Sequence, residues 1–179
     1  MLLVPRPTTL TSISLFPRRR VRTSSGYRLR CVRYWEDFHV GDVTSLGPIE
    51  VTEADVIEFA SRYDPQPFHT DPEAAKESVF GGLIASGWHT TALLMSMYVP
   101  AILTDSASLG SPGVESIRWS APVRPGDTLT GRVTIVESHP SATNPNRGTV
   151  VTKNELMNQH GETVLTMRAY GHIGRRDPG

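Results

Sequence analysis

The sequence has little of several features that define whole classes of protein. Its 179 residues include one cysteine, Cys31, so no intramolecular disulfide can form, and no His/Cys group has the spacing of a zinc site. No apolar run approaches the roughly 20 residues that a membrane-spanning helix needs. With 38% hydrophobic and 20% charged residues, the chain is predicted to form one soluble domain in a reducing compartment, with no metal, cofactor or membrane partner.

Acidic residues are missing from the first 35 positions, which hold eight arginines, at positions 6, 18, 19, 20, 22, 28, 30 and 33. The remaining positions hold 10 basic and 18 acidic residues, a formal charge of −8. That charge argues against nucleic acid as a partner of the folded part. We expect residues 1–33 to be a disordered Arg-rich leader and residues 34–179 to be the folded domain.

The composition of the leader is compatible with more than one cellular compartment. An Arg-rich, acid-free segment with serine and threonine is typical of a transit peptide, but Pro5, Pro7 and Pro17 would break the amphipathic helix that import uses. The other interpretations are a disordered extension, a translated upstream stretch, or an arginine arm that binds phosphates. We expect a cytoplasmic protein, or a mitochondrial matrix protein if the leader directs import.

Two helices are predicted after the leader. The first follows an irregular strand at residues 43–51, with Thr52 as N-cap, and ends at Tyr63-Asp64-Pro65. The second begins at Ala85 or Ser86 and runs to about Val99. It is apolar almost all round, which is typical of a helix enclosed by other structure. Further strands are predicted at residues 114–119, 128–135 and 165–173, so four antiparallel strands and a buried helix form an α+β layer.

Asp64 and His69 lie five residues apart in a segment that is stiffened by Pro65 and Pro67. Proline fixes its own φ angle and disfavours the helical region for the residue before it, so this segment is predicted to be extended. An isolated aspartate in a loop often bonds its own backbone. A rigidly held acid/base pair, however, is what proton-transfer chemistry requires.

Two motifs then resemble a known family. Asp64-Pro65-Gln66-Pro67-Phe68-His69, followed by Phe80-Gly81-Gly82-Leu83-Ile84-Ala85-Ser86-Gly87, is similar to the pattern of MaoC-like dehydratases, the (R)-specific enoyl-CoA hydratases of the hot dog fold. The resemblance covers about residues 34–173. It implies an antiparallel sheet wrapped around a long central helix, and a homodimer or a dimer of dimers. It also implies substrates that are thioesters of coenzyme A or of acyl carrier protein.

The resemblance also implies roles for individual residues. Asp64 and His69 match the catalytic pair that activates water for addition to a 2-enoyl thioester. Gly87 matches the glycine whose N–H stabilises the thioester enolate, and N–H groups at a helix start lack intrahelical partners. The alternative is that Gly87 merely allows close packing. We assign three neighbours to substrate binding: Gln66 and Ser86, where many members have asparagine and histidine, and Trp88.

Several alternatives stay open. His89 could line an acyl tunnel or be a packed side chain, and Arg118 and Arg124 could meet coenzyme A phosphates or be surface cations. A serine nucleophile is not indicated, because no G-x-S-x-G elbow is present. The leading interpretation is an (R)-specific hydro-lyase. The others are a thioesterase on the same fold and a module that binds acyl thioesters without reacting.

Overall fold

The computed structural model describes residues 20–23, 26–29 and 32–176, in two units that divide between Val32 and Arg33. In the first unit, β1 (Arg20–Thr23) and β2 (Gly26–Leu29) pair antiparallel. Residues 1–19, 24–25 and 30–31 of the Arg-rich leader, including Cys31, lie outside the described residues, so disorder and targeting stay predictions. Arg33 belongs to the second unit, where its guanidinium donates to the carbonyl of Ile102 at 2.8 Å.

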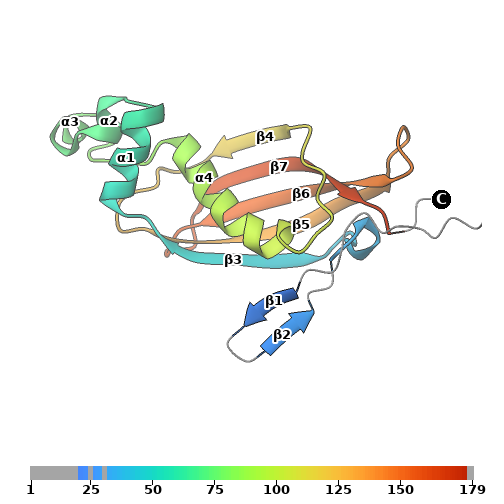
Figure 1. Ribbon diagram of the computed structural model, residues 1–179. Helices are drawn as coiled ribbons and strands as arrows, with labels where there is room; N and C mark the ends of the chain where they lie inside the picture. Colours follow the sequence, from blue (N-terminus) through green and yellow to red (C-terminus); the bar gives the residue numbers. More distant parts are fainter. Residues whose placement is uncertain (1–19, 24–25, 30–31, 177–179) are drawn as a thin grey trace, which may run out of the picture. The chain divides into compact units, whose positions relative to one another are not determined.

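The second unit is built on a five-stranded antiparallel sheet in the order β3-β5-β6-β7-β4. Figure 1 shows α4 (Gly87–Tyr98) lying across one face of this sheet. The predicted α+β architecture is therefore confirmed. The strands are β3 (Val43–Glu50), β4 (Val114–Trp119), β5 (Thr128–Pro140), β6 (Arg147–Met157) and β7 (Thr163–Gly174).

The prediction of four strands missed β6, which lies at the centre of the sheet. A half-buried strand alternates between apolar and polar residues, and this alternation is the pattern that reveals it. In β6, Val150, Val151 and Thr152 are all buried in succession. The polar run Lys153-Asn154-Glu155 then interrupts the apolar residues. The sequence of β6 therefore shows neither the alternation of a half-buried strand nor the continuous apolar run of a fully buried one.

The hydrophobic core lies between α4 and the sheet. Fully buried leucines come from α4, at Leu94, and from three strands, at Leu129, Leu156 and Leu165. Burying one leucine side chain of this kind contributes roughly 1.5–3 kcal/mol relative to leaving it exposed. These contacts fix the position of α4, and with it the position of the helix start.

The sequence predicted that α4 is enclosed by other structure, but only the face of α4 toward the sheet is buried. The helix begins at Gly87, one residue after the later of the two predicted starts, with Ser86 as its N-cap, and it continues into a π-helical turn, η2 (Val99–Leu103). Leu94 is fully buried, whereas Trp88 is 58% exposed, Met95 36% and Val99 41%. Among the described residues of the second unit, the outer face of α4 is therefore an exposed apolar stripe.

The first long helix, α1 (Glu53–Tyr63), begins and ends where the sequence predicted. The hydroxyl of Thr52 accepts the N–H of Asp55 at 3.1 Å and caps the helix. At the other end, Asp64 is the C-cap and its N–H donates to the carbonyl of Ala60 at 2.9 Å. The helix therefore delivers the Asp64 carboxylate at its C-terminal end.

The chain between Asp64 and His69 is extended only as far as Gln66, so the prediction for this segment is wrong beyond that residue. Pro67 opens a short helix, α2 (Pro67–Thr70), and Pro72 opens another, α3 (Pro72–Lys76). Proline restricts the residue before it, but its own φ angle is preorganised for the first position of a helix. The two prolines therefore start helical turns and do not merely stiffen an extended loop.

A 3-10 turn, η1 (Trp35–Asp37), opens the region in which the fold was expected to begin. Across the described residues, no helix has the length and apolar character required to cross a bilayer.

Candidate active site

Backbone hydrogen bonds bring the two motifs of the sequence together. The N–H of Ile84 donates to the carbonyl of Phe68 at 3.2 Å, so the glycine-rich segment runs beside α2. The next residue, Ala85, donates its N–H to the carbonyl of Val123 at 2.8 Å. Residues 84–86 are thereby held between the Asp/His segment and the strand connection at Val123, and they lead directly into α4.

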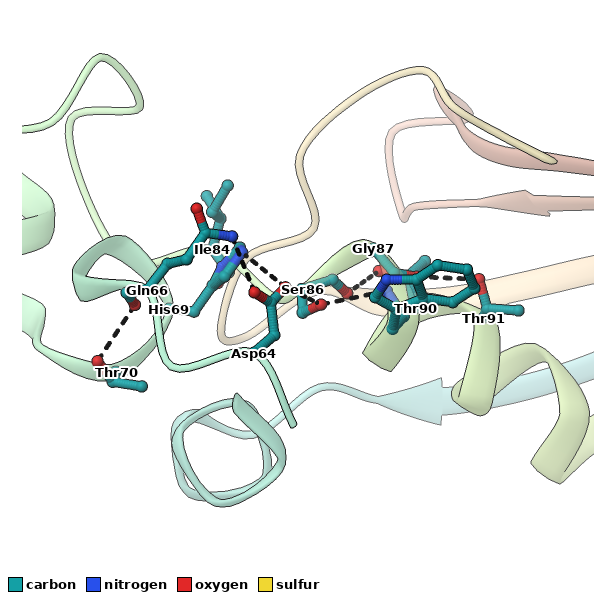
Figure 2. Close-up of polar contacts among 10 residues, drawn as sticks. Asp64, Gln66, His69, Thr70, Ile84, Ser86, Gly87, Thr90 and Thr91 are labelled. Atoms are coloured by element: carbon teal, nitrogen blue, oxygen red, sulfur yellow. Dashed lines mark hydrogen bonds and ion pairs between the residues drawn. The ribbon is translucent and has the colours of Figure 1, made fainter. Parts of the chain in front are cut away.

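The carboxylate of Asp64 is held by two donors. Its Oδ2 atom accepts the hydroxyl of Ser86 at 2.7 Å, and its Oδ1 atom accepts the side-chain amide of Gln66 at 2.8 Å. Figure 2 shows Asp64 lying between Ser86 and His69. A carboxylate has about four lone-pair positions, so Asp64 keeps accepting capacity on both oxygens.

The imidazole of His69 is buried and has a fixed orientation. Its side chain is 6% exposed, and Nδ1 lies 2.8 Å from the carbonyl oxygen of Ile84. Because a carbonyl can only accept, this contact places a hydrogen on Nδ1. The other nitrogen, Nε2, lies 3.5 Å from Oδ2 of Asp64. In the neutral ring, Nε2 and Oδ2 are then two neighbouring acceptors.

The surroundings of Asp64 favour its charged form. The pKa of Asp64 is lowered, chiefly by the hydrogen bond from Ser86. Partial burial acts in the opposite direction, while the hydrogen bond from Gln66 and the nearby imidazole of His69 lower the pKa further. At neutral pH Asp64 is therefore an ionised carboxylate, whose oxygens can accept hydrogen bonds.

Gly87 lies at the start of α4 and faces a cavity of about 330 Å³. As the first helical residue, its N–H has no intrahelical acceptor, and the helix dipole favours negative charge there. The cavity continues from Gly87 to Ile84, whose carbonyl orients His69. Its walls are largely apolar and include Phe80, Ile84, Ala85, Thr90, Trp119 and Val123.

Close packing also requires glycine at position 87. A Cβ atom there would lie 2.5 Å from the indole of Trp119, a separation that would force the ring to move. That indole donates to the hydroxyl of Thr91 at 3.2 Å and meets Trp88 edge-on, with 5.3 Å between the ring centroids. The packing role and the proposed N–H donor role of Gly87 are compatible, because they involve different atoms.

The structure thus brings Asp64, Gln66, His69 and Ser86 into one cluster, with Gly87 next to it. Of these five residues only Gly87 lines the cavity. Trp88, which is 58% exposed, also lies outside the cavity lining. Sequence reasoning missed the contributions of Ile84 and Trp119. Ile84 acts through a backbone carbonyl, which no side chain reveals, and Trp119 approaches Gly87 from a distant strand.

Two of the weaker candidates, His89 and Arg124, have structural roles. His89 is 6% exposed and its ring stacks on Phe59 at 4.8 Å, so it is a packed side chain outside the cavity lining. The guanidinium of Arg124 donates to the carbonyl of Phe80 at 2.7 Å and pins the loop before the glycine-rich segment. Among the residues that the structure describes, no group of three or more potential ligands could hold a metal ion.

Comparison with known proteins extends these observations. Residues 39–158 match the family model for the MaoC like domain. An (R)-specific enoyl-CoA hydratase from Rhodospirillum rubrum is 33% identical over 109 residues, which is 58% of this chain and 70% of that protein. The solved structure of a MaoC-like dehydratase from the same organism aligns with a TM-score of 0.75 and 39% identity, covering 81% of this chain and 99% of that one.

A second solved structure has a different name. It is described as a monoamine oxidase regulatory protein from Archaeoglobus, and it aligns with a TM-score of 0.76 and 32% identity over 83% of this chain and 98% of that one. The five-stranded sheet and α4 therefore form a hot dog fold. Since the family model covers more than half of the sequence, the chain belongs to the family of MaoC-like domains.

Proposed function

We propose that this protein is an (R)-specific hydro-lyase that interconverts 2-enoyl and 3-hydroxyacyl thioesters. The observation that carries the proposal is the pair of neighbouring acceptors, Oδ2 of Asp64 and Nε2 of His69, beside the start of α4. Hydration of a conjugated double bond needs a base for water and stabilisation of the enolate that forms. Asp64 and His69 supply the first, and Gly87 supplies the second.

In the direction of hydration, a water molecule donates its two hydrogens to Asp64 and His69. Its oxygen attacks the β-carbon as one of these hydrogens passes to the acid/base pair. The electron pair of the double bond moves to the thioester, whose oxygen accepts the N–H of Gly87. The α-carbon then takes a proton from the pair, so the product gains one molecule of water and both residues return to their starting forms.

The substrate is proposed to be an acyl thioester of coenzyme A or of acyl carrier protein. The apolar cavity of about 330 Å³ beside Gly87 supports this, because an acyl group needs apolar walls next to a polar reaction centre. The (R) configuration is supported by the name of the Rhodospirillum rubrum relative. No cofactor is required for this chemistry.

The proposed partner is a second copy of this chain. The apolar stripe on α4, formed by Trp88, Met95 and Val99, is accompanied by exposed apolar residues on the edge strand β4, at Val114 and Trp119. An edge strand has unpaired backbone groups, so it can extend the sheet across an interface. A homodimer would cover both the apolar stripe on α4 and the edge strand β4. Two such dimers could associate into a dimer of dimers.

The function is tested by following crotonyl-CoA with the purified protein. We expect loss of the absorbance of the conjugated double bond without release of free thiol, and chiral analysis should give the (R)-3-hydroxybutyryl thioester. Thiol release would instead identify a thioesterase. If neither signal changes with crotonyl-CoA or with longer, branched and carrier-bound enoyl thioesters, the proposal is wrong and a binding module is indicated.

A further inference from the structure

Ser86 occupies an unusual position between the two halves of the site. It has no exposed surface, and its hydroxyl makes two hydrogen bonds. It donates to Oδ2 of Asp64 at 2.7 Å and accepts the N–H of Trp88 at 3.2 Å, which makes it the N-cap of α4. One buried hydroxyl thus joins the carboxylate at the end of α1 to the first turn of α4.

We infer that Ser86 is a positioning residue, whose hydroxyl fixes the Asp64 carboxylate against the start of α4. This inference rests on the proposed hydratase function. It replaces the substrate-binding role that the sequence suggested for Ser86, since a side chain without exposed surface does not reach a substrate directly.

The geometry explains why the hydroxyl hydrogen points at Asp64. The N–H of Trp88 occupies an acceptor position on the serine oxygen, so the hydroxyl must turn its hydrogen elsewhere. The nearest charged acceptor is Oδ2 of Asp64, and a hydrogen bond to a carboxylate is about twice as strong as one between neutral groups. Ser86 therefore holds Asp64 directly and is not bonded to His69 as a nucleophile would be.

Gln66 provides a second, less protected restraint on Asp64. Its amide reaches Oδ1 at 2.8 Å from an exposed position, whereas Ser86 is buried and is anchored by the helix. The Ser86 hydrogen bond is also the largest cause of the lowered pKa of Asp64. Removing the hydroxyl should thus loosen the carboxylate and make it easier to protonate.

A purely structural role for Ser86, as a helix cap, predicts a different result. Capping affects the stability of α4 but not the titration of Asp64. Thr52 provides a matched control, because its hydroxyl caps α1 at the end opposite Asp64. Replacing Thr52 with alanine should lower stability and leave the pKa of Asp64 and the catalytic rate unchanged.

The experiment compares Ser86→Ala, Ser86→Gly, Ser86→Thr and Thr52→Ala. Glycine is tolerated at N-cap positions, so Ser86→Gly removes the hydroxyl even if Ser86→Ala does not fold. The first measurement is a carbon NMR titration of the Asp64 carboxyl without substrate, assigned with Asp64→Asn. The second is the pH profile of kcat/KM for crotonyl-CoA hydration.

We expect the pKa of Asp64 to rise in both hydroxyl-free variants, and the acid limb of kcat/KM to move to higher pH with it. At neutral pH, kcat should fall about tenfold or more while KM stays within about twofold, because the lost contact orients the base and not the substrate. Ser86→Thr, which keeps a hydroxyl, should recover most of kcat and of the pKa shift.

Two results would overturn the inference. One is an unchanged Asp64 titration in both hydroxyl-free variants; the other is a Ser86→Thr variant that folds but is as impaired as they are. If the wild-type protein hydrates no enoyl thioester, the proposed function fails on its own. The NMR titration still decides whether Ser86 controls the carboxylate.

Discussion

At the scale of single residues, orientation matters more than residue type. Asp64, His69 and Gly87 could be chosen from the sequence, because the two motifs carry them at recognisable positions. The sequence could not show that the carbonyl of Ile84 orients His69, since a backbone group leaves no trace in residue identity. Nor could it show that Ser86 faces Asp64, because 22 positions separate them along the chain.

His89 should make stability depend on pH. Burial lowers the pKa of His89 below its ordinary value of 6.5, and the nearby charge of Asp55 only partly opposes this. The folded state therefore binds fewer protons than the unfolded state below about pH 6.5. The stability from neutral His89 is fully present above that pH and is lost as the pH falls toward the lowered folded value.

Replacing His89 with phenylalanine, which can still stack on Phe59, should reduce the loss of stability as the pH falls below about 6.5. Urea unfolding at a series of pH values measures this loss. His39→Phe is the control, because that side chain is 73% exposed. An acid dependence that is identical in the wild type and in His89→Phe would contradict the assignment.

At the scale of helices and strands, the sequence predicts an element best where one local interaction determines where it begins. The cap at Thr52 and the start of α4 after Ser86 follow from hydrogen bonds within a few residues. The central strand β6 shows no strand pattern in the sequence, because consecutive residues are buried and a polar run then interrupts the apolar ones. The segment at Pro67 is predicted to be extended but forms a helical turn. Proline allows both, because it restricts the preceding residue and also starts helices.

The apolar stripe on α4 should control assembly. In sedimentation equilibrium, the wild-type protein is expected to give twice or four times the mass of one chain. Met95→Lys puts a charge in the middle of the stripe and should shift the protein toward monomer, since an unpaired charge in an apolar interface is costly.

Val79→Lys is the matched control for Met95→Lys, because Val79 is 96% exposed and lies outside α4 and β4. It should assemble like the wild type. A wild-type protein that remains monomeric at high concentration would rule out a homodimer, and equal assembly of the two lysine variants would place the interface elsewhere.

At the scale of the whole molecule, the described fold and the proposed site lie in the second unit. The two units divide between Val32 and Arg33, and a disordered leader at residues 1–33 stays a prediction. Arg33 itself contributes to the second unit, because it also lies over the ring of Phe38, with 4.7 Å between the guanidinium carbon and the ring centroid. Composition alone could not separate this arginine from those of the leader.

Deleting residues 1–32 should therefore leave both melting temperature and turnover almost unchanged. The segment lacks the apolar periodicity of a core element. Arg33→Ala in the same shortened protein should lower the melting temperature, because it removes the hydrogen bond to Ile102 and the contact with Phe38. Thermal unfolding and the crotonyl-CoA assay measure both quantities. A large loss on deletion of 1–32 alone would mean that the leader belongs to the fold.

The central claim is that Asp64 and His69 transfer the protons of a hydration reaction. The most direct test is the initial rate of crotonyl-CoA hydration by the wild type, Asp64→Asn and His69→Ala, with folding checked by circular dichroism. Asp71→Asn is the control, since Asp71 is an exposed carboxylate that caps α3 and asparagine caps equally well. We predict a loss of at least about a hundredfold for each site variant and a near-normal rate for Asp71→Asn. Near-normal hydration by folded Asp64→Asn and His69→Ala would contradict the account.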